Sequence, residues 1–237
     1  KELHYDVLIF IEDFNDTDRL ITIIREKEIE GLLLVDVADS TFVDTLESYN
    51  IPVVLINWYI LGRKNTLFVK TDLVESANLL VDYAAKKGYK DFGIINWEDK
   101  LFAQTVIEDA VNKRLQKYGI DTNTVTWNTN YRNSPEQIKE FIENSQKRVY
   151  ISFYHGDSIR ILNYCLQNGI KVPDDLAVLT YDNFEHYMFY EPTLTGIRQP
   201  FELQGEIAAE KLVGIISGKA NIKSEYVKPE FIIGDTC

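Results

Sequence analysis

Polar and aromatic side chains follow several apolar runs of this sequence, at points where they could bind a small ligand. The apolar run 176–181 ends on Asp182-Asn183, and the same change from apolar to polar recurs at Asn57-Trp58, Asn96-Trp97 and Tyr154-His155. A polyhydroxylated ligand requires planar bidentate groups for its hydroxyls and an aromatic face for the apolar side of its ring. The recurrence predicts a binding site, although Asp182 could instead cap the next turn, and Trp58 and Trp97 could be core or rim residues.

Motifs for catalysis or for metal binding are missing from the sequence. Its 3 histidines, His4, His155 and His186, have no metal-ligand spacing, and the glycine-rich phosphate loop, the dinucleotide fingerprint and the serine nucleophile motif are absent. The adjacent carboxylates of Asp174-Asp175 and Glu108-Asp109 are typical of surface groups rather than of a glycosidase pair that faces a cleft. We therefore expect a binding module and no enzyme, with no metal and no cofactor.

The charge balance of the chain argues against direct contact with nucleic acid. Its 237 residues are 45% apolar and 26% charged, and the formal net charge of −12 would repel a phosphate backbone. No apolar run approaches the roughly 18 residues of a membrane helix, and the first residues do not resemble a signal peptide. Cys165 and Cys237 are too few for a disulfide framework. We expect a globular, cytoplasmic protein with no membrane partner.

Apolar runs alternate with amphipathic segments along almost the whole chain. Strands are predicted at 5–11, 31–37, 52–57, 92–96, 148–153 and 176–181, and most of the intervals leave room for a helix. One helix is expected after Asp72, which forms a capping-box pattern with Glu75, and others after Ser134, near 157–168 and over 201–217. This order predicts an α/β fold with parallel sheets, in which ligands bind beyond the carboxyl ends of the strands.

One long segment, residues 169–200, resembles a known family. Its sequence, GIKVPDDLAVLTYDNFEHYMFYEPTLTGIRQP, is similar to the signature of the effector-binding domain of LacI/GalR-type bacterial transcription regulators. Segments 51–57, 69–96, 201–219 and 227–237 are also similar to family segments, in the family's order. The resemblance implies a periplasmic-binding-protein-like fold: two Rossmann-like lobes with parallel sheets flanked by helices, three crossover segments and an effector cleft between the lobes. It also implies a homodimer and a small-molecule effector of the carbohydrate kind.

The resemblance carries over to individual positions of the family's site. Asp182 and Asn57 lie where members place effector-facing aspartates, Tyr154-His155 replaces an Asn-Asp pair, and Gln199 matches a polar residue after a crossover. Ile107 stands where many members have an arginine, so the bidentate grip of that arginine is lost. The effector-binding residues expected from the strand ends and the resemblance together are Asp182, Asn57, Tyr154, His155, Gln199, Trp58, Trp97 and Asn183.

The resemblance also predicts how the chain is divided. We expect an N-terminal lobe at 1–97 and 194–222 and a C-terminal lobe at 98–193 and 223–237. The family's helix-turn-helix and the first strand and helix of its effector domain have no counterpart in the sequence. Operator DNA is therefore expected to be bound only through an N-terminal domain outside this chain, whose role would be effector sensing and dimerisation. The alternative is a solute-binding receptor of the same fold.

Overall fold

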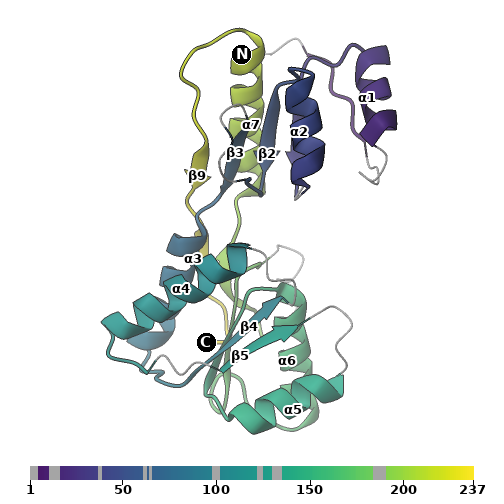
Figure 1. Cartoon of the computed structure of the whole chain (residues 1–237). Helices are drawn as coiled ribbons and strands as arrows, with labels where there is room; N and C mark the ends of the chain where they lie inside the picture. The colour runs from purple at the N-terminus through teal and green to yellow at the C-terminus, as the bar shows by residue number, and fades with distance from the viewer. Residues whose placement is uncertain are drawn as a thin grey trace. The chain divides into compact units, whose positions relative to one another are not determined.

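The computed structural model describes residues 5–10, 17–36, 39–60, 63, 66–97, 102–121, 125–129, 135–183 and 191–237. The side chains of 96–97, 102–104, 125–129 and 135 lie outside the description. The helices are α1 (Thr17–Glu26), α2 (Ser40–Ser48), α3 (Leu73–Lys86), α4 (Phe102–Lys117), α5 (Pro135–Ser145), α6 (His155–Gln167) and α7 (Phe201–Ile216) (Figure 1). The strands are β1 (Leu32–Val35), β2 (Val53–Ile56), β3 (Thr66–Thr71), β4 (Phe92–Trp97), β5 (Val125–Thr129), β6 (Val149–Ser152), β7 (Ala177–Thr180), β8 (Thr195–Arg198), β9 (Glu225–Val227) and β10 (Glu230–Ile232).

The chain forms two compact units and passes from one to the other three times. Unit 1 contains Lys1–Lys70 and Glu202–Glu225, and unit 2 contains Thr71–Phe201 and Tyr226–Cys237. These borders differ from the expected ones, because α3 and β4 belong to unit 2. β4 pairs with β5 and β6, and α3 packs on the same sheet. Successive βα repeats have the same apolar pattern, so the sequence does not tell which sheet a given strand joins.

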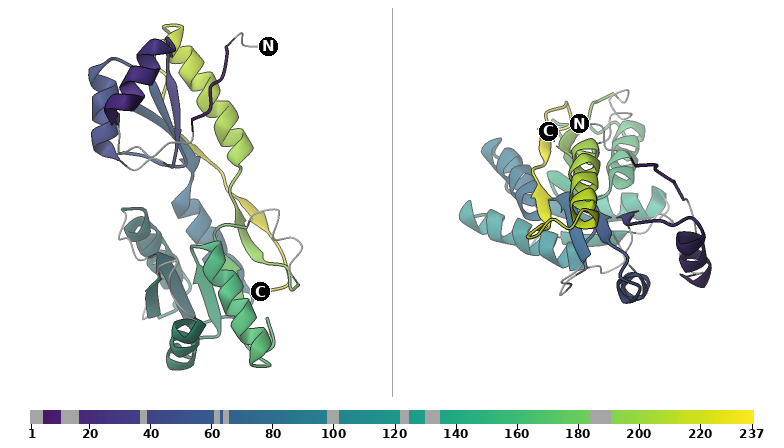
Figure 2. Two further views of the ribbon diagram at one scale, coloured as in Figure 1. Left: turned by 90° about the vertical axis from the view of Figure 1, so that its right-hand side faces the viewer. Right: turned by 90° about the horizontal axis from the view of Figure 1, so that it is seen from above.

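Unit 1 is built on a four-stranded sheet in the order β1-β2-β3-β9, in which β1, β2 and β3 are parallel. Helices α1 and α2 cover one face of this sheet and α7 covers the other (Figure 2). Asp39 starts α2, because its Oδ1 accepts hydrogen bonds from the backbone N–H groups of Thr41 and Phe42 at 2.7 and 3.2 Å. The core under α1 and α2 contains Leu34 of β1 and Leu55 of β2.

The strand predicted at 5–11 is wrong for the part that the structure describes. Residues 5–10 belong to no helix or strand, and Ile11 lies outside the described residues. The side chains of Val7 and Ile9 are 80% and 84% exposed. The composition of this segment suits a strand, but a strand also needs a neighbour to accept its backbone hydrogen bonds. No pairing of residues 5–10 occurs among the described residues.

Unit 2 has a six-stranded sheet in the order β10-β8-β7-β6-β4-β5. β5, β4, β6, β7 and β8 are parallel, and β10 runs antiparallel to β8. Core residues of α3 and α4 pack on one face of the sheet and those of α5 and α6 on the other. The predicted strands at 31–37, 52–57, 92–96, 148–153 and 176–181 are confirmed as β1, β2, β4, β6 and β7.

Asp72 starts helix α3, as its sequence pattern predicts. Its Oδ1 accepts from the backbone N–H groups of Val74 and Glu75 at 2.9 and 3.0 Å. The backbone N–H of Asp72, which Glu75 would bind in a complete capping box, instead donates to the carbonyl of Val227 at 2.9 Å. The cap therefore also ties the start of α3 to strand β9.

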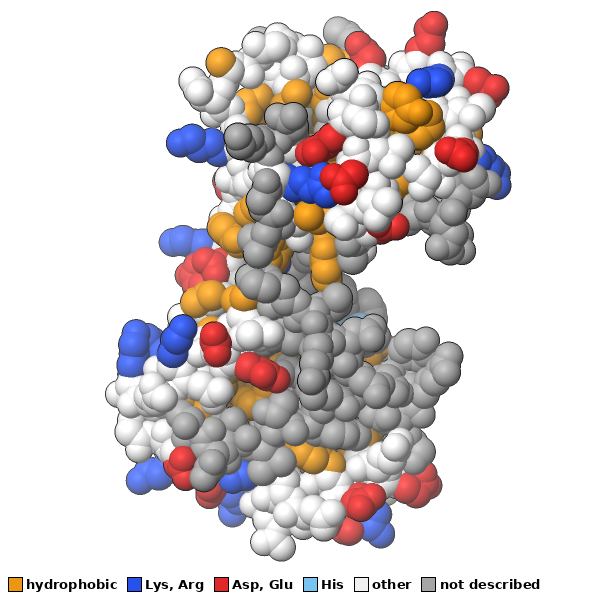
Figure 3. Space-filling view, in the orientation of Figure 1, with side chains coloured by type: hydrophobic (Ala, Val, Ile, Leu, Met, Phe, Trp, Pro, Cys, Tyr) orange, Lys and Arg blue, Asp and Glu red, His pale blue; other side chains and the backbone are white. Residues whose placement is uncertain are grey.

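Charged side chains of both signs are spread over the visible face of the molecule (Figure 3). Described Lys and Arg side chains lie among Asp and Glu side chains on that face, and the chain as a whole has a net charge of −12. Within the described residues, no helix is long and apolar enough to cross a membrane.

Candidate ligand-binding site

The candidate site in unit 2 lies at the carboxyl ends of its parallel strands. Ser152 of β6 pairs in register with Thr180 of β7, which pairs with Gly196 of β8. The polar residues that follow these strands therefore come to one edge of the sheet. In parallel α/β sheets this edge is where ligands bind.

Asp182 and Gln199 meet at this edge, 17 positions apart in sequence. Gln199 Nε2 donates a hydrogen bond of 2.6 Å to Asp182 Oδ1, which fixes the carboxylate and the amide side by side. Gln199 is only 7% exposed, and its Oε1 has no hydrogen-bond partner among the described residues. A buried acceptor without a partner is costly, so a ligand hydroxyl that donates to Oε1 would be stabilised there.

Tyr181, the residue before Asp182, is buried in the core and anchors the end of β7. Tyr181 is buried, and this burial, followed by the charge of Asp182, raises the pKa of Tyr181 well above its ordinary range. Its phenol therefore stays protonated at neutral pH. Tyr181 packs beside Phe153, with ring centroids 5.9 Å apart, so the strand ends that carry the site rest on an aromatic pair.

Asn183 is held inside the fold. It is 5% exposed, and its Nδ2 donates to the carbonyl of Leu194 at 2.8 Å while its backbone N–H donates to the carbonyl of Ile197 at 2.7 Å. These bonds connect the end of β7 to β8. Because the side-chain amide is used in this connection, we leave Asn183 out of the ligand set proposed below.

Tyr154 and His155 lie at the start of α6, next to the carboxyl end of β6. The centroids of their rings are 4.5 Å apart, and the interplanar angle is 49°. Ser152 Oγ donates to the carbonyl of Tyr154 at 2.6 Å and accepts from its backbone N–H at 3.2 Å, which fixes the turn from strand to helix. A Cβ on Gly156 would lie 2.5 Å from the Tyr154 ring, so only glycine permits this ring position. Half-buried aromatic faces are thus presented at the sheet edge.

The remaining predicted residues are divided between the units. Trp97 is the last residue of β4 in unit 2, and its side chain lies outside the described residues. Asn57 and Trp58 follow β2 in unit 1 and are half-buried. Asn57 Nδ2 donates to Asp36 Oδ1 at 2.7 Å. Ile107 is 5% exposed and lies in the core with α3, so it contributes packing at its position on α4.

A polar row lies at the carboxyl edge of unit 1, and only one of its members, Asn57, was predicted from the sequence. Val35 pairs with Ile56 and Ile56 with Val69, so the residues one step further, Asp36, Asn57 and Lys70, share a register position. Asp36 and Asn57 have φ values of +55° and +60°, a conformation that Asp and Asn tolerate better than most residues. Asp36 was not identified because it fell inside the predicted strand 31–37. Lys70 was not identified because no strand was predicted at 66–71.

A surface groove in unit 2 lies away from these strand ends. It lies between α5 and α6, and its lining includes Glu136, Lys139, Arg160 and Gln167. The α6 residues in this lining come from the middle and end of the helix, whereas the strand ends meet its start. We place the candidate site at the strand ends, where buried polar groups converge. Among the described residues, no group of His, Cys, Asp and Glu could hold a metal ion.

Comparisons with known proteins identify the family of this chain. Residues 81–237 match the model of the periplasmic binding protein-like domain family. The HTH-type transcriptional regulator MalR of Clostridium butyricum is 24% identical over 251 residues, which cover 100% of this chain and 74% of the relative.

Two solved structures share the fold. A regulatory protein of the LacI family from Chloroflexus aggregans has a TM-score of 0.84 at 17% identity, covering 96% of this chain and 83% of that one. The transcriptional regulator CelR in complex with cellobiose has a TM-score of 0.80 at 19% identity, and the match covers 94% of this chain and 70% of that one. The likeness extends over both units.

Proposed function

From the premise that this chain belongs to the periplasmic binding protein-like family and corresponds to the effector-binding domain of a LacI/GalR-type regulator, we propose that it binds a carbohydrate-like effector through Asp182 and Gln199. The observation that carries this proposal is the pairing of a carboxylate with a buried amide whose Oε1 has no partner among the described residues. Together these groups accept from and donate to adjacent hydroxyls of a sugar. The cellobiose bound to CelR supports this ligand class.

Aromatic side chains complete the proposed site. Tyr154 and His155 present rings beside the strand ends of unit 2, and Trp97 ends a neighbouring strand of the same sheet. Aromatic faces stack on the apolar side of sugar rings, whereas the polar groups orient the hydroxyls. In unit 1, Asn57 and Trp58 are half-buried groups of the same kinds at the end of β2. We assign binding, and no catalytic step, to these residues.

Effector binding would act on transcription through a shift in population. An effector that binds one arrangement of the two units more tightly than another favours that arrangement. We propose that this shift is passed to a DNA-binding domain elsewhere in the protein, in a homodimer, because the MalR relative is named as a helix-turn-helix regulator. A transport receptor of the same fold is less well supported, since these relatives are named as regulators.

Calorimetric titration with cellobiose and its component glucose tests the proposal. Asp182→Ala should weaken binding by roughly ten-fold or more, because a hydrogen bond to a charged group contributes about 1.5–3 kcal/mol. The matched control is Asp174→Ala, which removes an exposed carboxylate just before β7. Equal affinities of Asp182→Ala and the original chain, with folding intact by circular dichroism, would contradict the role of Asp182.

A further inference from the structure

Gly156, the second residue of helix α6, makes a contact that any side chain at this position would change. A Cβ there would lie 2.5, 3.1 and 3.2 Å from three atoms of the Tyr154 ring. The φ of Gly156 is not positive, so its backbone conformation does not itself require glycine. What the missing side chain provides is space for the Tyr154 ring.

The backbone of Tyr154 is too firmly held to move aside. Its carbonyl accepts hydrogen bonds from Ser152 Oγ at 2.6 Å and from the backbone N–H groups of Asp157 and Ser158 at 3.1 and 3.4 Å. Its own N–H donates to Ser152 Oγ at 3.2 Å. The side-chain torsions of Tyr154 are the freedom that remains. A methyl group at position 156 would therefore turn the ring and leave the turn in place.

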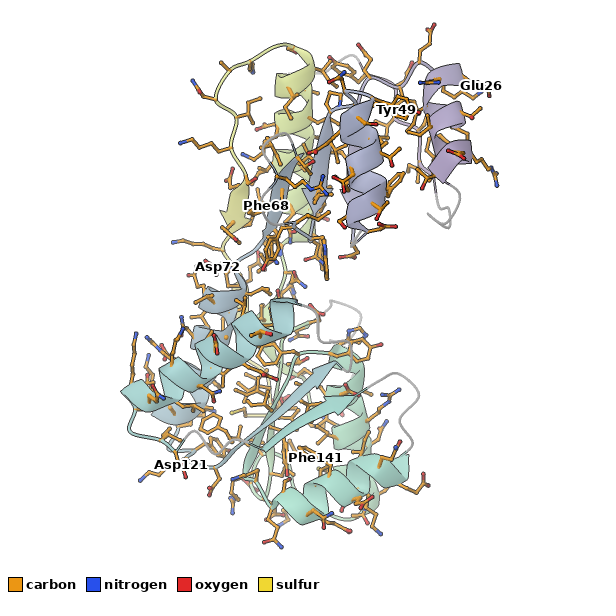
Figure 4. All side chains as sticks on the ribbon, in the orientation of Figure 1. Glu26, Tyr49, Phe68, Asp72, Asp121 and Phe141 are labelled. Carbon is orange, nitrogen blue, oxygen red and sulfur yellow. The ribbon has the colours of Figure 1, made fainter. Side chains whose placement is uncertain are left out.

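Strand β6, which precedes this turn, is held in the core of unit 2. Tyr150 of β6 is fully buried, and its ring packs against Phe141, which lies between α5 and the sheet, with ring centroids 5.7 Å apart (Figure 4). The Tyr150 hydroxyl lies 2.6 Å from Ser145 Oγ. The Tyr154 ring thus extends from a well-packed base, and residue 156 limits where it can lie.

We propose that Gly156 is a positioning residue of the effector site, which lets the Tyr154 ring lie against α6 where it stacks on the apolar side of a sugar ring. This inference rests on the proposed function. With alanine at position 156, the ring would have to move by about 1 Å, from 2.5 Å to the 3.4 Å of an ordinary contact. A gap of about 0.5–1 Å already removes a quarter to a half of the attraction between two surfaces.

Calorimetric titration with whichever of cellobiose and glucose binds the original chain more tightly tests the inference. We expect Tyr154→Ala to lower the affinity roughly three- to ten-fold, and Gly156→Ala to lower it by a similar factor although the ring is retained. Tyr154→Phe keeps the ring and should retain most of the affinity. The matched control is Gly205→Ala in α7, where a Cβ would meet no atom within 4 Å among the described residues, and it should leave the affinity unchanged.

A double variant separates the positioning role from a general effect on the fold. The affinity of Gly156→Ala combined with Tyr154→Ala should equal that of Tyr154→Ala alone within about two-fold, because the new methyl group then has no ring to displace. Gly156→Ala should be no less stable to heat than the original chain, since alanine favours a helix more than glycine does and a side-chain ring can turn away. Circular dichroism measures this stability.

The outcomes separate this inference from the proposed function. An affinity of Gly156→Ala equal to or above that of the original chain would overturn the inference and leave the Asp182 and Gln199 site standing. A further loss of affinity in the double variant, beyond that of Tyr154→Ala, would do the same. Binding of neither sugar by the original chain would instead contradict the proposed function and remove the basis of this inference.

If Gly156→Ala does not fold, the NMR shifts of the Gly156 α-protons provide the second test. The current of a neighbouring aromatic ring displaces proton shifts, so we expect these shifts to be displaced in the original chain and in Tyr154→Phe, but not in Tyr154→Ala. Equal shifts in all three proteins would show that the ring does not lie against Gly156 and would overturn the inference.

Discussion

The two units use the same βα order but differ in how completely their sheets are covered. In unit 2, β6 and β7 have other strands on both sides, and all of their side chains are buried. In unit 1, β1 is the outermost strand, and Leu33 and Val35 are 38% and 58% exposed. Similar apolar runs thus become a covered strand in one sheet and a partly exposed edge in the other, depending on their neighbours.

The backbone of β1 shows the same difference. Leu32 donates to the carbonyl of Pro52 at 2.9 Å and Asp36 donates to the carbonyl of Ile56 at 3.1 Å, so the alternate residues of β1 face β2. Leu33 and Val35 lie between them, and their N–H and C=O groups point away from β2 because backbone groups alternate along a parallel strand. The edge of unit 1 therefore combines exposed apolar side chains with outward-facing backbone groups, a combination that most proteins cover.

A pair of leucine substitutions gives the largest expected contrast between the units. Leu179→Ala removes a fully buried side chain from the core between the sheet and α3 and should cost about 2–5 kcal/mol. Leu33→Ala, on the exposed side of β1, should cost less than about 1 kcal/mol. Urea unfolding followed by circular dichroism measures both. Similar losses would mean that β1 is covered in solution, and that the contrast between the sheets is smaller than the structure indicates.

The two units also differ in an ion pair, and here the expected effect on stability is smaller than for the leucine substitutions. In unit 2, the hydrogen bond from Arg114 lowers the pKa of Asp82, against burial that raises it. A lowered folded pKa means that the pair stabilises the fold above the unfolded pKa of about 3.9, and that this contribution is lost as the pH falls through the folded value. In unit 1, Arg63 binds Asp44, whose side chain is 63% exposed, and Glu47.

Asp82→Asn should therefore cost no more than about 1 kcal/mol at pH 7 and almost nothing near pH 2. Asp44→Asn should have a smaller effect at either pH, because water screens the exposed Asp44 more strongly. Thermal unfolding of both variants across this pH range provides the measurement. A cost of Asp82→Asn that does not depend on pH would show that the carboxylate charge is not what stabilises the α3–α4 contact.

Much of the fold could be predicted because continuous apolar runs mark covered parallel strands. The runs at 148–153 and 176–181 have this pattern and become β6 and β7. β3 was not predicted because its sequence, TLFVKT, mixes polar and apolar residues, and a lysine such as Lys70 is usually a surface residue although here it is buried. The segment 5–10 shows the opposite error, since composition cannot tell whether a strand has a partner.

Site residues could be predicted where they follow a single recognisable strand or match the family's motif, but the contacts between residues of different strands could not. Asp182 follows a recognisable strand, and Gln199 was identified from the family resemblance. Their 2.6 Å hydrogen bond, and the use of Asn183 to hold Leu194, depend on how β7 and β8 align. The row of Asp36, Asn57 and Lys70 depends on the register of three strands. Such long-range register is set by packing and cannot be inferred from local sequence patterns.

Hydrogen exchange with and without bound sugar tests most directly the central proposal, that residues at the carboxyl ends of the parallel strands bind the effector. The ligand is whichever of cellobiose and glucose binds more tightly in calorimetry. We predict slower exchange in peptides that contain Asn57–Tyr59, Tyr154–Ser158 and Asp182, and unchanged exchange in α5, which lies away from the strand ends. Protection confined to α5 and the later turns of α6, with unchanged exchange at the strand ends, would contradict the account.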